Sequence, residues 1–284
     1  MIVWITGTSG LAGSYAYKRL CCESDYEVVS INREIISDLS DSSELCSIEK
    51  LEKPDCIVHC AATIPGQRHS DRQAAEINRK IDDNILQIAN VFGAKVIYAS
   101  SFSVYKEYGK EVILEESMPT HVSAGECSMY VWEKIQSERL FETLNDCIIF
   151  RISSPYGLGQ KNTNVLKVFV DNVRENKNIS YFGTGERTQD FIHSSDIAEA
   201  IAAALLAGVS GIYNIGFGRS VSMKQLAQCV AACAPRYTGA VSGSDEDDPQ
   251  RDFRVNLCNE KARMSFGWTP KISLERGIKE LLEA

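Results

Sequence analysis

The amino-acid sequence predicts an α/β fold, built on a doubly wound parallel sheet with a smaller C-terminal lobe. Three observations support this fold class: apolar runs of strand length recur along the chain, amphipathic segments of helical length separate them, and only short connections are left between the two. Strands that are apolar throughout are typical of a parallel sheet with helices on both faces. Short connections are typical of alternating strand and helix units.

The first half of the chain carries this alternation most clearly. The expected strands are Ile2–Thr6, 27–32, 56–62, 95–100 and Cys147–Ile152. The expected helices are 11–22, Asp71–Phe92 and 126–144. These segments are expected to form one parallel sheet covered on both faces.

The regular alternation of strands and helices ends at about residue 153, and shorter elements follow. Helices are expected at 162–175, 195–206 and 222–233, and short strands at Ile179–Phe182 and 211–216. Residues 183–190 and 242–252 are rich in glycine and polar side chains, so both are expected to be loops. We therefore expect one sheet-based domain followed by a smaller lobe.

The composition is that of an ordinary globular protein, with 284 residues, 30 basic and 38 acidic side chains and a formal net charge of −8. An acidic protein is a poor general binder of nucleic acid or of anionic membranes, so neither is an expected partner. The sequence has no apolar run of ~18 residues that could span a membrane, and it begins MIVWITG without a basic leader. A cytoplasmic location is therefore expected.

Ten cysteines are present, but none belongs to a CxxC pair. Most lie within apolar runs such as DCIVHC, where a free cysteine behaves as a small hydrophobic side chain. We expect reduced, buried thiols, and neither a disulfide framework nor a metal site.

A glycine-rich loop, TGTSGLAG, directly follows the first expected strand and precedes the first expected helix. Gly7, Gly10 and Gly13 allow a tight turn, a close approach of backbone N–H groups to a phosphate, and close packing of the helix on the sheet. The unpaired N–H groups at the start of the helix favour an anion. This strand–loop–helix context predicts binding of a dinucleotide, to which Ser9 and Leu11 of the same loop are expected to contribute.

The end of the second expected strand distinguishes between the two nicotinamide cofactors. An acidic residue there binds the ribose of NAD, whereas an arginine suits the 2′-phosphate of NADP. The strand ends in Asn32 and Arg33, with no acidic residue before Glu34. We therefore expect NADP(H) as the preferred cofactor, while NAD stays open. Asp38 and Leu39 are expected to lie near the adenine.

Tyr130 and Lys134 form the motif YVWEK on the third expected helix. Because they are four residues apart on a helix, the two side chains share one face. A lysine cation close to a tyrosine stabilises its phenolate and lowers its pKa, so the pair can serve in acid–base catalysis. Ser101 follows the strand 95–100, at the edge of the sheet where ligands bind in this fold class, and its hydroxyl can donate a hydrogen bond to a carbonyl oxygen.

The motifs TGTSGLAG, HCAA, SSFSVY and YVWEK, in this order, resemble those of the extended short-chain dehydrogenases/reductases, in the branch of nucleotide-sugar epimerases, dehydratases and reductases. The segments GTGERTQDFIHSSDIAEAI, GIYNIG and FGWTPKISLERGI extend the resemblance over nearly the whole chain. It implies a dinucleotide-binding Rossmann domain over 1–160, completed by about 188–217, and a substrate-binding lobe over 161–187 and 218–284. It also implies a homodimer formed through a four-helix bundle of the helices Asp71–Phe92 and 126–144.

The resemblance implies roles for individual residues. Tyr130 is the expected general acid/base, Lys134 tunes it and holds the nicotinamide ribose, and Ser101 binds the reacting oxygen. Further cofactor contacts are expected from Ala61, Ala62 and Asn78. The helix motif around Asn78 usually contains Gly-Thr, where this chain has Ile81 and Asp82.

The expected substrate is a nucleotide-sugar, and departures from the family pattern narrow its reaction. Family dehydratases carry Asp-Glu directly after the catalytic Ser or Thr, where this chain has Phe102 and Ser103, so dehydration is not expected. The 3,5-epimerising reductases use a Cys and a His, and the corresponding residues here are Ser103 and Asn164. Ser154 replaces an Asn near the nucleotide sugar. The expected substrate contacts are Ser103, Ser154, Asn164, Arg187 and Arg251, with the two arginines on the diphosphate.

Two sugar reactions remain. A 4-keto reductase needs exchangeable NADPH and the Ser, Tyr and Lys set, whereas a 4-epimerase needs tightly held NAD and a pocket in which the keto intermediate can rotate. Arg33 favours the reductase, which we expect to act on a nucleotide-activated 4-keto-6-deoxysugar. A non-catalytic cofactor-binding regulator is disfavoured because Ser101, Tyr130 and Lys134 are all present. A reductase of non-sugar ketones would not need Arg187.

Overall fold

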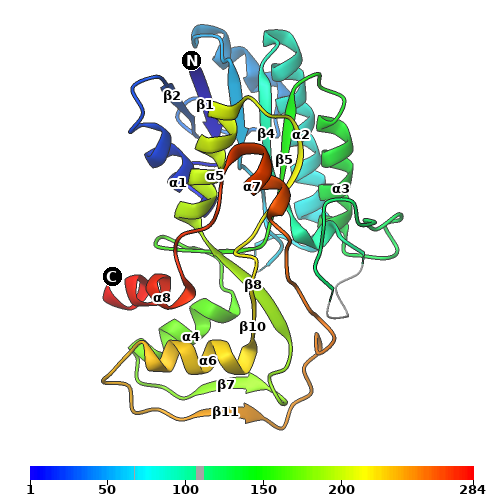
Figure 1. Ribbon diagram of the computed structural model, residues 1–284. Helices are drawn as coiled ribbons and strands as arrows, with labels where there is room; N and C mark the ends of the chain where they lie inside the picture. The colour runs from blue at the N-terminus through cyan, green and yellow to red at the C-terminus, as the bar shows by residue number, and fades with distance from the viewer. Residues whose placement is uncertain (67, 107–111) are drawn as a thin grey trace.

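The computed structural model describes residues 1–66, 68–106 and 112–284 of the chain. Its largest element is a six-stranded parallel sheet in the order β2-β1-β3-β4-β5-β9 (Figure 1). The strands are β1 (Ile2–Thr6), β2 (Glu27–Ile31), β3 (Cys56–His59), β4 (Lys95–Ser101), β5 (Cys147–Ile152) and β9 (Gly211–Ile215). The strand order reverses at β1 and β3, and ligands bind at such a point, beyond the carboxyl ends of the strands.

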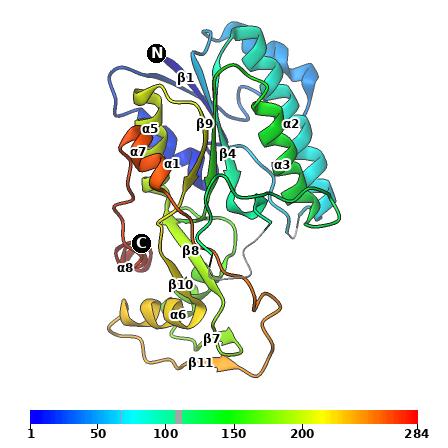
Figure 2. The ribbon, with the colours of Figure 1, turned by 45° about the vertical axis from the view of Figure 1, so that its right-hand side comes forward.

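Helices cover both faces of this sheet (Figure 2). On one face lie α2 (Asp71–Phe92) and α3 (Met129–Phe141), and on the other lie α1 (Leu11–Leu20), α5 (Ser194–Ala207) and α7 (Glu260–Phe266). The side chains of β1 alternate between the two faces: Val3 and Ile5 pack with α1 and α5, whereas Trp4 packs with α2. The sheet is therefore apolar on both faces, as the continuous apolar strands predict.

A second group of elements lies beyond one end of the sheet, in the lower half of Figure 1. It contains a three-stranded sheet in the order β10-β8-β6 and a pair formed by β7 and β11. The strands are β6 (Ser154–Tyr156), β7 (Ile179–Phe182), β8 (Thr188–His193), β10 (Ser220–Ser222) and β11 (Val241–Ser244), and the helices are α4 (Val165–Arg174), α6 (Met223–Ala232) and α8 (Leu274–Glu283). These elements enclose a core of their own, in which Leu166, Phe169 and Leu226 are buried.

Capping side chains decide where the helices begin. The hydroxyl of Ser70 accepts from the N–H of Gln73, whose side chain accepts from the N–H of Ser70, so α2 starts with a capping box. Gly93, with a φ of 65°, ends the same helix. α3 begins later than the predicted segment 126–144, because the hydroxyl of Ser128 accepts from the N–H of Val131 and caps it there.

Three predicted boundaries are wrong. The strand expected over 56–62 ends at His59, because the chain leaves the sheet at Cys60, whose carbonyl group lies close to Gly7. The loop expected over 183–190 contains the start of β8 at Thr188, and the loop expected over 242–252 contains the end of β11 at Ser244. Pairing with neighbouring strands makes these polar segments extended. Helix ends otherwise differ from the predicted ones by at most three residues.

The strands β6 and β10 and the 3₁₀ segments Ser42–Lys50 and Phe102–Val104 were not predicted by any sequence pattern. The expectation of buried thiols is also only partly confirmed. Among the described cysteines, Cys56 and Cys147 are buried, Cys21 and Cys22 are exposed, the rest are half-buried, and none forms a disulfide. Burial raises the pKa of the Cys56 and Cys147 thiols to about 12, so both stay protonated.

Two kinds of feature are missing from the part of the chain that the structure describes. No helix there has both the length and the apolar character needed to cross a membrane. No group of three or more His, Cys, Asp or Glu side chains there is arranged to hold a metal ion.

Candidate active site

The glycine-rich loop connects β1 to α1 and folds tightly against the segment after β3. Gly7 has a φ of +71°, and a Cβ atom on it would lie 2.6 Å from the backbone of Cys60 and Ala61. A Cβ atom on Gly13 would overlap the carbonyl group of Gly7. Gly10 precedes α1 and has no side chain to cap it, so the first N–H groups of the helix remain available to an anion.

A cavity of about 800 Å³ lies beside this loop, at the carboxyl ends of β1, β2 and β3. The predicted cofactor residues that line it are Gly7, Ser9, Gly10, Asn32, Arg33, Asp38, Leu39, Ala61 and Ala62. Leu11 and Gly13 lie in the first turn of α1. The cavity is large enough for a bound nucleotide. It is also lined by Thr8, which lies within the glycine-rich motif, and by Ser37 and His69, which no local sequence pattern marks because they reach the cavity only when their loops fold.

Asn78 on α2 holds the segment that follows β3. Its amide oxygen accepts from the N–H of Thr63 at 2.6 Å, and its amide nitrogen donates to the carbonyl oxygen of Thr63 at 2.9 Å. Thr63 lines the cavity, so Asn78 shapes one wall of it through this loop.

Arg33 and Glu34 follow β2 and line the cavity as well. Asn32 shapes this turn, because its side-chain oxygen accepts from the N–H of Glu34 at 2.9 Å. The hydroxyls of Thr8 and Ser30, 2.6 Å apart, join the end of β2 to the glycine-rich loop. Arg33 is exposed at this end of the cavity.

Ser101 is the last residue of β4, and its hydroxyl is oriented by Ser103. The Oγ of Ser101 accepts from the backbone N–H of Ser103 at 3.2 Å and from the hydroxyl of Ser103 at 2.9 Å. A serine hydroxyl has one hydrogen and two lone pairs. Both lone pairs of Ser101 are thus in use, and its own hydrogen is left to donate to a ligand.

Tyr130 and Lys134 lie one turn apart near the start of α3. The carboxylate of Asp71 accepts from the N–H of Tyr130 at 3.1 Å and so fixes this end of the helix. Lys134 is buried, and its Nζ donates to the hydroxyl of Tyr98 at 2.9 Å and to the carbonyl oxygen of Ala99 at 3.0 Å. The ammonium group is therefore held against β4, while the Tyr130 side chain is half-buried.

The buried carboxylate of Glu138 joins α3, which carries Tyr130 and Lys134, to β5 and to the end of β4, which carries Ser101. Arg151 on β5 donates from Nη2 to Oε2 of Glu138 on α3 at 2.7 Å, and the two side chains are only 5% and 4% exposed. Ser100, the neighbour of Ser101 on β4, donates to Oε1 of the same glutamate at 2.5 Å. Glu138 thus fixes α3 relative to the end of β4.

Arg187, the predicted diphosphate ligand, lies just before β8 and is 13% exposed. Its Nε lies 3.2 Å from Oδ2 of Asp248, and its Nη1 contacts the side-chain oxygen of Gln250. These partners come from the acidic segment after β11. An anion that binds Arg187 must therefore compete with Asp248 for the guanidinium group.

The other predicted arginine, Arg251, lies further from the strands. Its side chain is 74% exposed, and its Nε is 3.9 Å from the carboxylate of Asp252. Arg254, which the sequence motifs do not mark, pairs through its backbone with Thr188, the first residue of β8, and is half-buried. Arg254 is thus joined to the strand that follows Arg187, whereas Arg251 is largely exposed.

The remaining predicted substrate residues are less closely grouped. Ser103 contacts Ser101, as described above, and Ser154 on β6 is buried and accepts from the side-chain amide of Gln189. The side-chain oxygen of Asn164 accepts from the N–H of Lys167 at 2.9 Å and caps α4. Asn164 is thus engaged in starting a helix.

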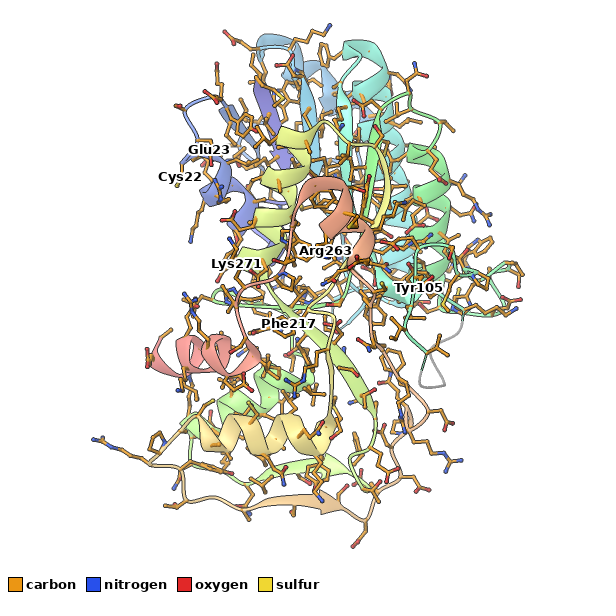
Figure 3. The ribbon with its side chains drawn as sticks, in the orientation of Figure 1. Cys22, Glu23, Tyr105, Phe217, Arg263 and Lys271 are labelled. Carbon is orange, nitrogen blue, oxygen red and sulfur yellow. The ribbon has the colours of Figure 1, made fainter. Side chains whose placement is uncertain are left out.

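Two acidic residues of the motif GTGERTQDFIHSSD join the lobe to the sheet. Asp190 accepts from the N–H groups of Phe217 at 2.9 Å and Gly218 at 3.0 Å, and Phe217 lies between the two groups of elements (Figure 3). Asp196 accepts from the N–H of Lys271 at 2.9 Å, on the segment that leads to α8. Both carboxylates act as anchors for backbone segments.

Known proteins resemble this chain in sequence and in structure. A model of the NAD dependent epimerase/dehydratase family matches residues 3–216. A GDP-L-fucose synthase of Sinorhizobium fredii is 26% identical, over 99% of this chain and 94% of its own. A putative UDP-glucose 4-epimerase of Methanocaldococcus jannaschii is 25% identical, over 99% and 97%. The structure of Thermus thermophilus UDP-glucose 4-epimerase in complex with NAD has a TM-score of 0.84 and 23% identity, over 100% of this chain and 98% of that chain.

These matches confirm the predicted fold class and the resemblance that the motifs indicate. The relatives align over nearly the whole chain, so the lobe is included as well as the sheet. A glycine-rich loop beside a nucleotide-sized cavity, and a Tyr-Lys pair on a helix that covers the same sheet, agree with binding of a nicotinamide cofactor. The chain belongs to the NAD-dependent epimerase/dehydratase family, whose members are NAD(P)-dependent nucleotide-sugar epimerases, dehydratases and reductases.

Proposed function

We propose that this protein is an NADP(H)-dependent oxidoreductase that reduces a nucleotide-activated 4-keto-6-deoxysugar. The observation that carries this proposal is the environment of Ser101. The next two residues are Phe102, which is 9% exposed and buried in an apolar cluster, and Ser103, which donates onto Ser101. These two positions therefore supply no carboxylic acid or carboxylate to remove a hydroxyl group. Hydride and proton transfer at a carbonyl needs only Ser101, Tyr130 and Lys134.

The chemistry follows from where these side chains are held. When bound, the nicotinamide cofactor supplies the hydride for the carbonyl carbon. Tyr130 gives its phenolic proton to the carbonyl oxygen, and the ammonium group of Lys134 stabilises the resulting phenolate. Ser101 donates its free hydrogen to the same oxygen, where negative charge develops during the transfer. The carbonyl thus gains one hydride and one proton and becomes an alcohol.

The experiment that tests this proposal follows NADPH absorbance in the presence of GDP-, UDP-, CDP- and dTDP-linked 4-keto-6-deoxysugars. We expect one nucleotide series to be reduced, with NADPH consumed in equal amount to the alcohol formed. Thermal shifts with GDP, UDP, CDP and dTDP identify the nucleotide in advance, because a ligand stabilises the fold that binds it. If no sugar of the four series consumes NADPH, the proposal is wrong.

A 4-epimerase is the second candidate, and the match to a putative UDP-glucose 4-epimerase over 99% of the chain favours it. An epimerase oxidises and then reduces the same carbon, so no net cofactor is consumed. Purified protein that carries bound NAD and interconverts UDP-sugars without added cofactor would support this candidate. NADPH consumption without sugar epimerisation would exclude it.

The first prediction concerns cofactor preference. Arg33→Ala is expected to weaken NADPH binding by about tenfold to a hundredfold, because a charge-assisted contact with the 2′-phosphate is lost. NADH affinity should change little. Fluorescence titration with both cofactors measures the effect, and Arg72→Ala, on an 80% exposed side chain of α2, is a control for loss of a surface charge. Equal weakening of NADPH and NADH would contradict the role given to Arg33.

The diphosphate of the nucleotide-sugar is expected to depend more on Arg187 than on Arg251. Arg187→Ala is expected to abolish most of the thermal stabilisation that the preferred nucleoside diphosphate gives, because Arg187 is the more enclosed of the two predicted cations. Arg251→Ala should reduce it less, since that side chain is largely exposed. The shift is measured with and without ligand for each variant, so any change in intrinsic stability cancels. A larger loss for Arg251→Ala would reverse the assignment.

A further inference from the structure

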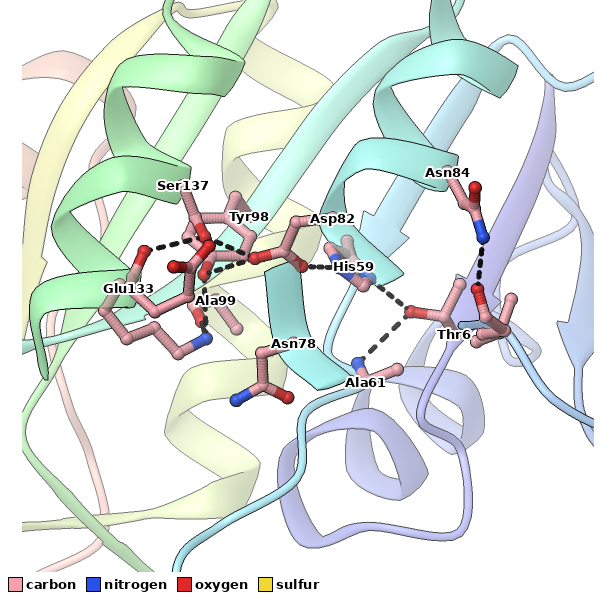
Figure 4. Close-up of polar contacts among 12 residues, drawn as sticks. Thr6, His59, Ala61, Asn78, Asp82, Asn84, Tyr98, Ala99, Glu133 and Ser137 are labelled. Carbon is pink, nitrogen blue, oxygen red and sulfur yellow. Dashed lines mark hydrogen bonds and ion pairs between the residues drawn. The ribbon is translucent and has the colours of Figure 1, made fainter. Parts of the chain in front are cut away.

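Asp82 is a buried carboxylate behind the candidate active site, at a position where the family motif has a threonine. It lies on α2 and is 3% exposed. Its Oδ1 is 2.7 Å from Nε2 of His59. Its Oδ2 accepts from the hydroxyl of Tyr98 at 3.2 Å and from the hydroxyl of Ser137. Figure 4 shows Asp82 between these side chains, which come from β3, β4 and α3.

A hydrogen-bonded chain leads from Asp82 to the ammonium group of Lys134. A tyrosine hydroxyl has a single hydrogen, and that of Tyr98 is donated to Asp82. Tyr98 therefore presents a lone pair to Nζ of Lys134, which donates to it at 2.9 Å and lies 4.5 Å from the centre of its ring. The carboxylate thus fixes the direction of the hydroxyl that holds the lysine.

The protonation of this chain is set by its surroundings. Burial raises the pKa of Asp82, but the hydrogen bond with His59, together with the charge of Lys134, outweighs burial and brings the pKa below its usual range. Burial and the charge of Asp82 raise the pKa of Tyr98 well above its ordinary value. At neutral pH the carboxylate is therefore charged, and the phenol next to it is neutral.

Other titratable groups lie around this chain. Asp71 on α2 contacts the backbone of Tyr130, and Cys60 after β3 and Glu133 on α3 lie within the field of Lys134. Glu138 on α3 acts on Tyr98, whereas Arg79 and Asp83 on α2 act on Glu133. Asp71 accepts from the backbone of α3, and Glu138 is paired with Arg151. Burial raises the pKa of Glu133 to about 7. Among the described residues, Asp82 is the carboxylate that a hydrogen-bonded chain connects to Lys134.

We propose that Asp82 is a positioning residue whose buried negative charge keeps the Tyr130–Lys134 pair protonated and ready to donate a proton. This inference rests on the proposed reductase function, in which Tyr130 must start as an acid. A nearby negative charge makes the loss of a proton from either the phenol or the ammonium group less favourable. The direction of this effect is the same for the phenol and for the ammonium group, so it does not depend on which of them loses its proton.

The test removes the charge and keeps the shape. In Asp82→Asn, the amide oxygen can still accept from Tyr98 and Ser137, and the amide nitrogen can donate to His59 in its other tautomer. We expect the alkaline limb of kcat/KM for NADPH-dependent reduction to move to lower pH by about one unit. At pH values above the limb the rate should fall about tenfold, while below the limb it should match the wild type.

Asp83→Asn is the matched control. It removes the same charge from the next residue of α2, where the carboxylate is 56% exposed and 4.0 Å from Arg79. Solvent screens an exposed charge, so the limb should stay where it is in the wild type. If Asp82→Asn does not fold, Asp82→Thr replaces it in every measurement, because threonine also removes the charge and is the residue usual in the family motif.

A second measurement needs no substrate. The ultraviolet absorbance of tyrosinate is titrated for the wild type and for Tyr130→Phe, and the difference reports Tyr130 alone. The same pair of titrations in the Asp82→Asn background should show the Tyr130 transition at lower pH. If the transition moves although no 4-keto sugar is reduced, the proposed reaction is wrong and the role of Asp82 stands. If neither the transition nor the rate limb moves, Asp82 only supports the fold, and the inference is overturned.

Discussion

Tyr130→Phe is expected to lower kcat for NADPH-dependent sugar reduction by about 10²–10⁴-fold, the usual contribution of a positioned general acid. The phenyl ring keeps the shape of the side chain and removes only the proton donor. Within the described residues, the Tyr130 hydroxyl has no hydrogen-bond partner, and the contact that fixes its helix position uses the backbone N–H and Asp71. The free energy of unfolding and the affinity for NADPH should therefore change little.

The measurement compares kcat, NADPH affinity and the thermal midpoint of the variant with those of the wild type. Tyr26→Phe is a suitable control, because Tyr26 precedes β2 and lies far along the chain from α3. It removes the same atom without touching the pair. A Tyr130→Phe enzyme that retains its rate to within about threefold would show that proton donation comes from another group.

The strands and helices that depend on continuous patterns could be predicted from the sequence. β1, α2, β5 and β7 have the predicted bounds, because an apolar run or a strong amphipathic period is interrupted only at their ends. The short strands β6 and β10 could not, since each has three residues whose extended form depends on pairing with β8. Thr188 belongs to that same sheet, which is why a segment that resembles a loop in sequence is partly strand.

The candidate site likewise contains residues that the sequence predicts and residues that it does not. Ser101, Tyr130, Lys134 and the glycine-rich loop could be predicted because each depends on spacing within a single strand, loop or helix turn. The partners that hold them are distant in sequence: Asp82 is 55 residues from Ser137, and Glu138 is 38 residues from Ser100. No local pattern encodes such pairs. The available signal was a charge inside an apolar segment, as for Arg151 in CIIFRI, because a buried charge requires a partner.

A large effect on stability is expected when the ion pair between Arg151 and Glu138 is broken. Glu138→Ala is expected to lower the free energy of unfolding by about 3–5 kcal/mol, because it leaves the guanidinium group of Arg151 buried without its counter-charge. Urea unfolding measures the loss. Glu76→Ala is the matched control: it breaks a pair with Arg72 in which the side chains are 61% and 80% exposed, and it should cost no more than about 0.5 kcal/mol. If both variants lost a similar free energy of unfolding, burial would not be what makes the pair of Arg151 and Glu138 important for stability.

The double variant Glu138→Leu with Arg151→Met separates the contribution of Glu138 to stability from its contribution to the alignment of Ser101 with Tyr130. This double variant leaves neither charge unpaired, so it should recover much of the free energy that Glu138→Ala loses. It does not restore the acceptor for Ser100, whose hydroxyl ties the end of β4 to α3 beside Ser101. The rate of sugar reduction should therefore stay low although the fold is stable again, since the donor hydroxyl and Tyr130 must be held in one geometry. Full recovery of the rate would mean that packing alone aligns Ser101 with Tyr130, and that the ion pair contributes only to stability.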